Sequence, residues 1–469
     1  MTSKTKRGMF VALSAGAVLA VSACSGGATP APGGSTASGG TDGSATDCAA
    51  FDSYGDLSGK TITVYTSIAS DAEAEPHIDA FVPFEECTGA KVEYEGSREF
   101  EAQLPVRVKA GNAPDLAYIP QPGLLQTLVK ENADKVVPVG EAATANVDKY
   151  YKEFWKSVGM VDGKYYGIPI GANAKSFVWY SPKVFAEKGY EIPKTWAELI
   201  ALSDQIAADI PADDTTTKPW CAGIESGGAT GWPATDWVED MMLRVGTPEQ
   251  YDQWVNHEIP FNDPTVVKAI DQAGSILKNE KYVNGGLGGI TTIATTPFTD
   301  AGFPILDGMC FMHRQASFYQ ANWQTADPDA EVSENGDVWA FPLPGESATP
   351  PVLVGGEFAL AFRDAPEVAA LQAYLTSPEW SNAKADATPN GGWLSANSEL
   401  DPNKLVKPID KMSYELITAD DAVVRFDGSD LMPSAVGAGS FWKEMTDWIA
   451  LGKSTQDAAT AIETSWPKQ

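Results

Sequence analysis

Residues 60–120, KTITVYTSIASDAEAEPHIDAFVPFEECTGAKVEYEGSREFEAQLPVRVKAGNAPDLAYIP, contain three strand patterns separated by two helical patterns. Each strand run is short and rich in β-branched and aromatic residues, as buried strands are. The three runs are 60–66, 90–96 and 114–120. Helical spacing covers roughly 72–86 and 99–110, and Gly111 ends the second helix. This alternation predicts an α/β fold with a parallel sheet covered on both faces, and a ligand site beyond the carboxyl ends of its strands.

Later helices are marked by a capping residue followed by proline. Such pairs occur at Ser181-Pro182, Asp263-Pro264 and Ser377-Pro378, and Thr195–Glu198 has the pattern of a capping box. From about residue 365 onward the chain is expected to be mainly helical. The body of about 420 residues is too long for one core. Because it has no internal repeat or long linker, we expect two lobes that share the chain by crossing back and forth.

The first 23 residues have the organisation of a secretory signal peptide. A basic start over 4–7 is followed by an apolar run over 9–23, as export signals require. The run is too short to span a bilayer, which takes roughly 20 apolar residues. The sequence VSAC at 21–24 resembles a bacterial lipobox, in which the cysteine, here Cys24, is lipidated and becomes the N-terminus. The alternative is an ordinary signal with a chance cysteine.

A flexible tether is expected after Cys24. Residues 25–47 are almost entirely Gly, Ser, Ala, Thr and Pro, a composition that cannot bury enough apolar surface to fold. As a free chain they would reach roughly 25–30 Å. We therefore expect a signal peptide over 1–23 and a lipidated cysteine with its tether over 24–57. The body would then lie outside the bacterial cell membrane and contact it only through the lipid.

The charge of the chain narrows the class of partner. The net charge is −30, and removal of the three basic residues of the signal gives about −33. Nucleic acid is excluded as a partner, because its phosphates require Lys and Arg. An anionic ligand would be repelled by the overall field. The net negative charge of the chain therefore favours a neutral small-molecule ligand.

Setting Cys24 aside leaves an even number of cysteines, as a disulfide-bonded exported protein requires. Four cysteines allow three pairings. We favour Cys48–Cys87 and Cys221–Cys310, because the first pair joins the start of the first strand to the end of the first helix. Buried free thiols are the alternative.

Residues for catalysis or metal binding are sparse. The chain has three histidines, His77, His257 and His313, and none has metal-ligand spacing to another. No nucleophile-elbow motif is present. Paired carboxylates can hydrolyse glycosides, and Asp236 with Glu239 is the pair that most merits testing. We expect no metal, no cofactor and no catalytic residue.

Tryptophans near glycine, proline and polar residues point to a sugar ligand. Sugars offer apolar C–H faces, which stack on flat rings, and hydroxyl groups, which bind carboxylates, amides and arginine. TGWPATDW (230–237) supplies Trp232, Asp236 and Trp237, and NGGWLSANS contains Trp393. The alternative for the first motif is a turn with core tryptophans.

Five segments resemble the solute-binding lipoproteins of carbohydrate ABC importers, and are most similar to the branch associated with α-glucosides. They are DGKYYGIPIGANAKSFVWYSPKVFAEKGYEIPKTWAEL (162–199), AGNAPDLAYIPQPG (110–123), GGATGWPATDWVEDMMLR (227–244), CFMHRQASF (310–318) and VGGEFALAF (354–362). The resemblance covers 58–469. One departure is that family members often have further aromatic residues where this chain has Gly171-Ala172-Asn173.

The resemblance implies a two-lobe periplasmic-binding-protein-like fold (type II), hinged, with a helical C-terminal part. It also implies a monomer that captures a sugar by lobe closure and delivers it to ABC permease subunits, without enzymatic activity. The implied division assigns 58–167 plus 309–354 to lobe one and 171–308 plus 356–469 to lobe two, with hinge segments at 167–170 and 355–356.

The residues expected to contact the sugar come from the cleft edges and the crossings. Arg98 and Glu99 follow the second strand. Alternatively, they are charged side chains on an exposed loop without a binding role. Asn173 and Lys175 follow the first crossing. Alternatively, they are polar side chains on the surface of a strand without a binding role. The remaining candidates are Trp232 and Trp393 for stacking, Trp237 beside them, Asp236 as an acceptor, Arg314 and Gln315 as donors, and Gly356 for close backbone approach.

Two other functions stay open at this point. A secreted glycan-degrading enzyme would use paired carboxylates. A binding protein for a peptide or another polar solute would share the fold but differ in its ligand.

Overall fold

The computed structural model describes residues 48–283, 288–346, 350–419 and 422–468. The predicted signal peptide, the predicted lipidation site Cys24 and most of the predicted tether lie outside these residues. Thr46–Gln469 forms one unit by itself. None of the described helices is both long and apolar enough to cross a membrane.

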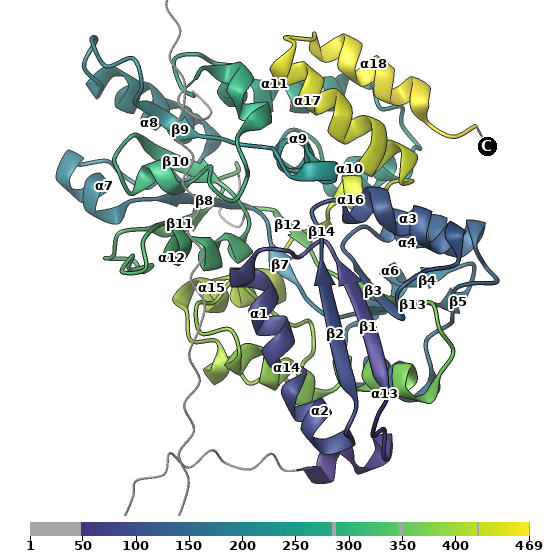
Figure 1. The fold of residues 1–469 in the computed structure, drawn as a ribbon. Coiled ribbons are helices and arrows are strands. Elements are labelled where there is room, and N and C mark those ends of the chain that lie inside the picture. The colour runs from purple at the N-terminus through teal and green to yellow at the C-terminus, as the bar shows by residue number, and fades with distance from the viewer. Residues whose placement is uncertain (1–47, 284–287, 347–349, 420–421, 469) are drawn as a thin grey trace, which may run out of the picture. The chain divides into compact units, whose positions relative to one another are not determined.

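A five-stranded sheet with the order β2-β1-β3-β13-β6 forms the centre of the first lobe (Figure 1). β1, β2 and β3 are parallel, as expected from the sequence, and β13 runs antiparallel between β3 and β6. The strands are β1 (Thr61–Thr66), β2 (Lys91–Gly96), β3 (Leu116–Ile119), β13 (Phe358–Ala361) and β6 (Gly167–Pro169).

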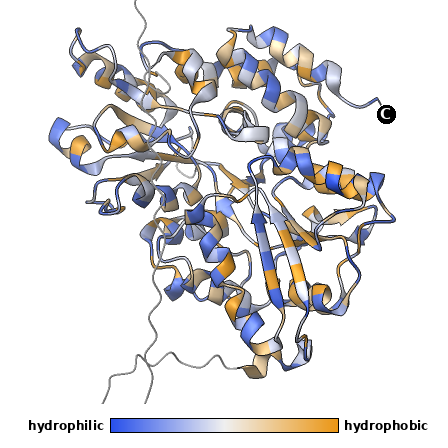
Figure 2. Cartoon of the chain, in the orientation of Figure 1, coloured by the Kyte–Doolittle hydropathy of each residue, from blue (hydrophilic) through white to orange (hydrophobic). Residues whose placement is uncertain are grey.

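Helices cover both faces of this sheet because neighbouring strand residues point to opposite sides. Tyr65 and Ile119 pack with α3 (Phe100–Ala110) and α4 (Pro122–Glu131). Val64 and Tyr118 pack in the second core cluster, on the other face. The helices on that face are α1 (Asp71–Asp79), α2 (Val82–Thr88), α5 (Glu141–Tyr150), α13 (Pro366–Leu375) and α14 (Pro378–Asp386). Figure 2 shows hydrophobic and hydrophilic segments alternating along β2, the edge strand.

The helix predicted over 72–86 is two helices, α1 and α2. Pro83 lies in the first turn of α2. A proline has no N–H to continue the preceding helix, and its ring clashes with the carbonyl four residues earlier, so it starts a new helix instead. Gly111 ends α3 in the left-handed conformation, as the sequence predicted.

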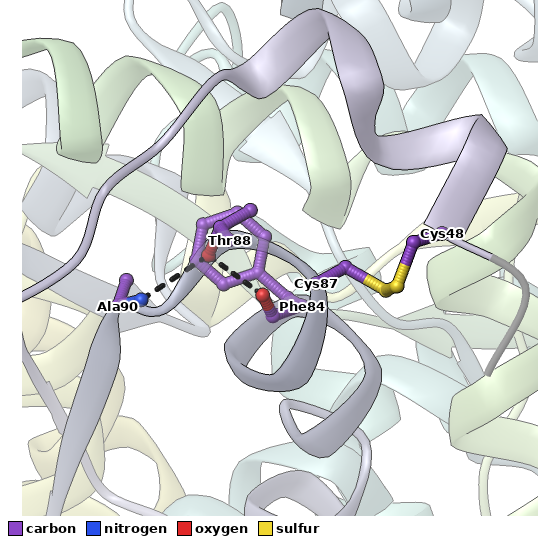
Figure 3. Close-up of a disulfide and its surroundings, with 5 residues drawn as sticks. All are labelled: Cys48, Phe84, Cys87, Thr88 and Ala90. Carbon is purple, nitrogen blue, oxygen red and sulfur yellow. Dashed lines mark hydrogen bonds between the residues drawn. A yellow bond between two sulfur atoms is a disulfide. The ribbon is translucent and has the colours of Figure 1, made fainter. Parts of the chain in front are cut away.

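The Cys48–Cys87 disulfide ties the start of the described chain to α2 (Figure 3), which confirms this predicted pairing. Beside it, the Thr88 hydroxyl donates to the carbonyl of Phe84 at 2.7 Å and accepts from the Ala90 N–H at 3.3 Å. The side chain thus links the end of the helix to the start of β2.

The second lobe contains a four-stranded sheet with the order β11-β8-β10-β9. β10 runs parallel to β9 and antiparallel to β8. The strands are β8 (Phe177–Tyr180), β9 (Lys218–Cys221), β10 (Cys310–Arg314) and β11 (Trp339–Pro342). The Cys221–Cys310 disulfide joins β9 to β10, so the second predicted pairing is also confirmed.

Helices of the second lobe begin at the predicted capping residues. Ser181 and Asp263 accept hydrogen bonds from the first turns of α7 and α11, and Ser377 does so for α14 in the first lobe. Thr195 caps α8, but Glu198 accepts from the Lys194 N–H, so the capping box is incomplete. These helices are α7 (Pro182–Lys188), α8 (Trp196–Asp209), α9 (Trp232–Val245), α10 (Pro248–Val255), α11 (Pro264–Leu277), α17 (Trp442–Ala450) and α18 (Thr455–Ser465).

A small sheet lies where the chain passes between the lobes. It has the order β14-β12-β7, from β14 (Val424–Phe426), β12 (Val352–Gly355) and β7 (Asn173–Ala174). β7 connects β6 of the first lobe to β8 of the second, and β12 leads into β13 of the first lobe. A further passage runs from α14 to α15 (Pro408–Thr418), which contacts β7 and β12.

The strand pairings correct the predicted division of the chain. The segment 309–354 was assigned to lobe one, yet its strands β10 and β11 belong to the second sheet. The segment 356–469 was assigned to lobe two, yet β13 pairs with β3 and β6 of the first. The reason is that β10 is held beside β9 by parallel pairing and a disulfide, and strand composition does not reveal which sheet a strand joins.

Candidate functional site

A cavity of about 380 Å³ lies between the loops of the two lobes, within the size range of small-molecule sites. The first lobe contributes segments that follow the carboxyl ends of its parallel strands: Ser67–Ser70 after β1, Arg98 after β2 and Gln121 after β3. The second lobe contributes Ser226 and Trp232. The cavity therefore lies where the parallel-sheet argument placed the ligand site.

Aromatic rings form much of the wall on the second lobe. Trp232, at the start of α9, packs against Phe298 and Phe318 with ring centroids 5.0 and 6.0 Å apart. Trp393 lines the cavity from the passage between α14 and α15. Trp232 and Trp393, the two tryptophans expected to stack on a sugar, therefore line one cavity.

A lysine ammonium lies over each of these two rings. Lys175 Nζ is 5.3 Å from the ring centroid of Trp232, and Lys384 Nζ is 4.9 Å from that of Trp393. Such contacts hold the rings by cation–π attraction. Because a cation already occupies one face of each ring, a second cation bound on the opposite face would be disfavoured.

The crossing segments meet at the edge of the cavity. The Ile170 N–H donates to the Glu357 carbonyl, and the Ala172 N–H donates to the Leu394 carbonyl, each at 2.9 Å. A Cβ on Gly356 would lie 2.4 Å from the Gly171 carbonyl oxygen, so only glycine permits this approach. Gly356 lines the cavity, as predicted for close backbone approach.

Arg98 joins the two lobes at the rim of the cavity. Its guanidinium lies 2.5 Å from the Glu225 carboxylate, and its carbonyl accepts from the Gly228 N–H at 3.0 Å. Glu99 is the exposed residue that precedes α3 and does not line the cavity. The arginine predicted to bind sugar hydroxyls thus forms an interlobe ion pair.

Lys175 connects the cavity to a buried network of charged groups. Its ammonium lies 3.1 Å from Asp236 Oδ1 and contacts the Asp427 carboxylate. Arg314 binds the other Asp236 oxygen at 2.8 Å and Asp240 at 2.5 Å. All five side chains are buried. The network ties β10 to α9 and to the segment after β14 that contains Asp427.

Besides Glu99, four predicted contact residues do not line the cavity, so the structure gives no support to their assignment to direct sugar contact. Asp236 and Arg314 are fully occupied by the network, and their side chains have no exposed area. Trp237 packs edge-on against Trp220 at 5.5 Å, and Gln315 Oε1 accepts from the Ala316 N–H at 2.8 Å. None of the four lines the cavity. The sequence placed them on the right elements, but could not tell which helix and strand faces point inward.

Burial and neighbouring charges shift the pKa values of the carboxyl groups in this network. Burial, reinforced by Asp427 and Asp236, raises the pKa of Glu239 well above its usual value. Burial also raises the pKa of Asp430, with Asp427 adding to the effect. Burial opposes ionisation of Asp427 as well, but Lys175 outweighs it and lowers the pKa to about 2. Burial thus favours the protonated forms of Glu239 and Asp430, while Lys175 favours the ionised form of Asp427.

The carboxyl groups of Asp236, Glu239 and Asp427 lie within 4.8 Å of one another, a spacing that could hold a metal ion. Lys175 supplies the positive charge there instead, since its ammonium contacts two of the three. Asp236 and Glu239, the pair considered for glycoside hydrolysis, are both fully buried and are separated from the cavity.

Sequence reasoning missed several polar residues that line the cavity. They are Glu73, Glu101, Gln121, Glu357, Lys384 and Asp430. Gln121 directly follows β3, at the same sheet edge that indicated Arg98, so the strand pattern could have found it. Lys384 lies on α14 and Glu357 precedes β13. Placing them at the cavity required knowing which lobe contains each of these elements, and the sequence did not reveal this.

Comparison with known proteins agrees with this architecture. The family model of the bacterial extracellular solute-binding proteins matches residues 65–382. The chain belongs to this family. The solute-binding protein is 40% identical over 426 residues to the osmoprotective compounds-binding protein GgtB of Synechocystis sp., covering 90% of this chain and 96% of that one. It is 36% identical over 431 residues to the alpha-glucosides-binding periplasmic protein AglE of Rhizobium meliloti, covering 88% of each.

Solved structures share the two-lobe fold of this solute-binding protein. The bacterial solute receptor AcbH, which prefers β-D-galactopyranose, has a TM-score of 0.70 at 19% identity, with 86% of this chain and 98% of that one covered. The GacH receptor of Streptomyces glaucescens, solved with acarbose, has a TM-score of 0.67 at 14% identity, with 87% and 97% covered. At these identities the likeness concerns the fold.

Proposed function

We propose that this solute-binding protein captures a neutral polyhydroxylated solute of the α-glucoside class and presents it to an ABC importer. The observation that carries the proposal is the cavity with Trp232 and Trp393 in its walls and polar side chains between them. Flat rings suit the C–H faces of a sugar, and the polar groups suit its hydroxyls. The α-glucosides bound by AglE, 36% identical over the chain, support the same class.

The cations near the cavity argue against charged solutes. Arg98 is paired with Glu225, and Lys175 with Asp236 and Asp427. Lys384 also lines the cavity, but burial lowers its pKa to about 7, which weakens it as an anion site. Lys175 over the Trp232 ring disfavours a quaternary ammonium on the opposite face. Among osmoprotective compounds, the class that GgtB binds, the cavity therefore favours neutral polyols over betaines.

Capture would proceed by closure of the lobes. In an open form each lobe presents half of the cavity. A solute that contacts both halves binds the closed form more tightly and shifts the population towards it. The sugar-contacting residues in this proposal are Arg98, Asn173, Lys175, Trp232, Gly356 and Trp393. The bound form then docks on the permease, and no bond in the solute is broken.

The location of the protein is part of the proposal. A signal peptide over 1–23 and lipidation of Cys24 would hold a monomer on the outer face of the cell membrane, next to the permease. The Gly- and Ser-rich composition of 25–47 supports a tether. Intact mass of the protein extracted from membranes tests this, since an unmodified Cys24 would remove the anchor and leave solute binding in place.

A thermal-shift screen tests the solute class. Maltose, sucrose, trehalose and methyl α-D-glucopyranoside are compared with glycine betaine, glucose 6-phosphate and a tripeptide, because a ligand of the folded state raises the melting temperature. We expect a rise with at least one α-glucoside and none with the charged solutes. A rise with the tripeptide alone would contradict the proposal. Chromatography after long incubation with maltooligosaccharides should show no products, and products would indicate a hydrolase.

A further inference from the structure

Glu101 and Gln121 form a polar pair at one wall of the cavity. Glu101 lies in the first turn of α3, and Gln121 is the residue that precedes α4. α3 follows β2 and α4 follows β3, the strands on either side of β1 in the first lobe's parallel sheet. Gln121 Nε2 donates to Glu101 Oε1 at 3.2 Å. This bond fixes both side chains and leaves one oxygen on each.

The remaining oxygens have no hydrogen-bond partner in the described part of the chain. Glu101 Oε2 and Gln121 Oε1 are both buried, and Gln121 is only 5% exposed as a residue. More than nine in ten buried polar groups in native proteins are paired, and an unpaired acceptor opposes folding. Two neighbouring unpaired acceptors in the wall of one cavity therefore indicate a ligand that donates to both.

The charged groups around the pair do not supply donors. Glu99, which precedes α3, is an acid whose charge raises the pKa of Glu101. Asp430, on the segment Gly428–Leu431 (α16), is an acid whose own pKa is raised in part by Glu101. Two basic groups that line the same cavity are committed elsewhere, Arg98 to Glu225 and Lys175 to Asp236. Donor groups of a solute in the cavity would complete the hydrogen bonding of the pair.

We propose that Glu101 and Gln121 determine specificity by receiving two adjacent hydroxyl groups of the bound solute. The inference rests on the proposed function, because it assigns part of the same cavity. It selects solutes with a free vicinal diol over those in which either hydroxyl is absent or alkylated. The raised pKa of Glu101, about 7 because of burial, agrees with a carboxyl group kept in the cavity without a compensating cation.

Apolar replacements of similar shape distinguish a binding role from a structural one. Glu101→Met and Gln121→Met each remove the polar atoms with little change of volume. Without solute, both variants should melt at a higher temperature than wild type at pH 8, because they remove an unpaired buried acceptor. Lys109→Met, at an exposed position on the same helix, is the matched control and should leave the melting temperature unchanged. Variants that melt lower than wild type would make the pair an ordinary structural contact.

Calorimetric titration with methyl α-D-glucopyranoside and its monodeoxy analogues gives the second measurement. We expect each methionine variant to weaken binding of the parent glucoside at least tenfold. Two adjacent deoxy analogues should bind wild type weakly, yet lose little further affinity in the variants. Equal losses for all analogues in wild type and variants would overturn the inference while leaving sugar binding established. If wild type binds no glucoside, the proposed function fails, and the melting temperatures alone then decide the role of the pair.

Discussion

The Arg98 guanidinium follows β2 of the first lobe and lies 2.5 Å from the carboxylate of Glu225, which follows β9 of the second. The Arg98 carbonyl also accepts from the Gly228 N–H. These contacts join the two lobes directly at the rim of the cavity. Because both contacts are made between groups of the protein, they contribute to the free energy of the arrangement in which the two lobes meet.

Replacing Gly227 by alanine should weaken closure. Gly227 has φ of 57°, and a Cβ there would lie 2.6 Å from the Arg98 carbonyl oxygen, so the contact cannot form unchanged. We expect solute affinity to fall roughly tenfold, about 1.4 kcal/mol, as measured by calorimetric titration with the best α-glucoside of the screen. Gly140→Ala, where a Cβ would make only an ordinary contact at 3.9 Å, should leave affinity unchanged. Equal affinity in both variants would show that this contact does not control closure.

Trp232→Ala should remove a stacking surface without unfolding the protein. The ring lines the cavity and is partly exposed. We expect binding of the same glucoside to weaken at least tenfold, about 1.4 kcal/mol, while circular dichroism and the melting temperature stay near those of wild type. Trp232→Phe should recover part of the affinity. Trp466→Ala, a change at a tryptophan that stacks on His257 away from the cavity, serves as the control.

Arg314→Met should destabilise the second lobe. Arg314 has no exposed side-chain area and binds both Asp236 and Asp240, and removal of one partner of a buried ion pair typically costs about 3–5 kcal/mol. Urea denaturation measures the loss. Lys183→Met breaks the exposed pair with Asp337 and should cost less than about 1 kcal/mol. A loss as small as that of Lys183→Met would mean that the buried network contributes little to stability.

Lys384 should make stability depend on pH above neutrality. Burial, only partly offset by Glu357, Glu73 and Asp410, lowers its pKa to about 7. Between pH 7 and 10 the unfolded chain then binds more protons at this site than the folded chain, so the contribution of Lys384 to stability rises with pH. Lys384→Met should raise the melting temperature most at pH 7 and least at pH 10. A difference from wild type that does not change with pH would contradict the lowered pKa, and Lys183→Met is the exposed control.

Local signals in the sequence were sufficient for much of the first lobe. The β-branched runs at 60–66 and 90–96 became β1 and β2, because a buried parallel strand has a distinctive composition. Proline after serine or aspartate marked the helix starts correctly, because capping is a local interaction. Element order favoured Cys48–Cys87, and with Cys24 set aside the two remaining cysteines formed the second pair; the structure contains both disulfides.

The site was only partly predictable, because it depends on contacts between distant segments. Trp232 and Trp393 were recognised from neighbouring glycines and prolines. Asp236 lies four residues after Trp232 but points into the ion network, and no local pattern distinguishes these directions. Glu101 was overlooked because its environment includes Gln121 and Asp430, which are brought near only by the folded chain.

The small sheet β14-β12-β7 has a kinetic consequence for capture. β7 and β12 run antiparallel and each continues into a lobe, and α15, at the end of the third passage, contacts both strands. Adjacent connecting segments restrict twisting and sliding of the lobes relative to one another. They therefore favour rotation of the lobes about a single hinge axis. Each closure then brings the same faces together in the same alignment. A solute bound to one lobe is then captured by this single rotation, so few encounters end without productive closure.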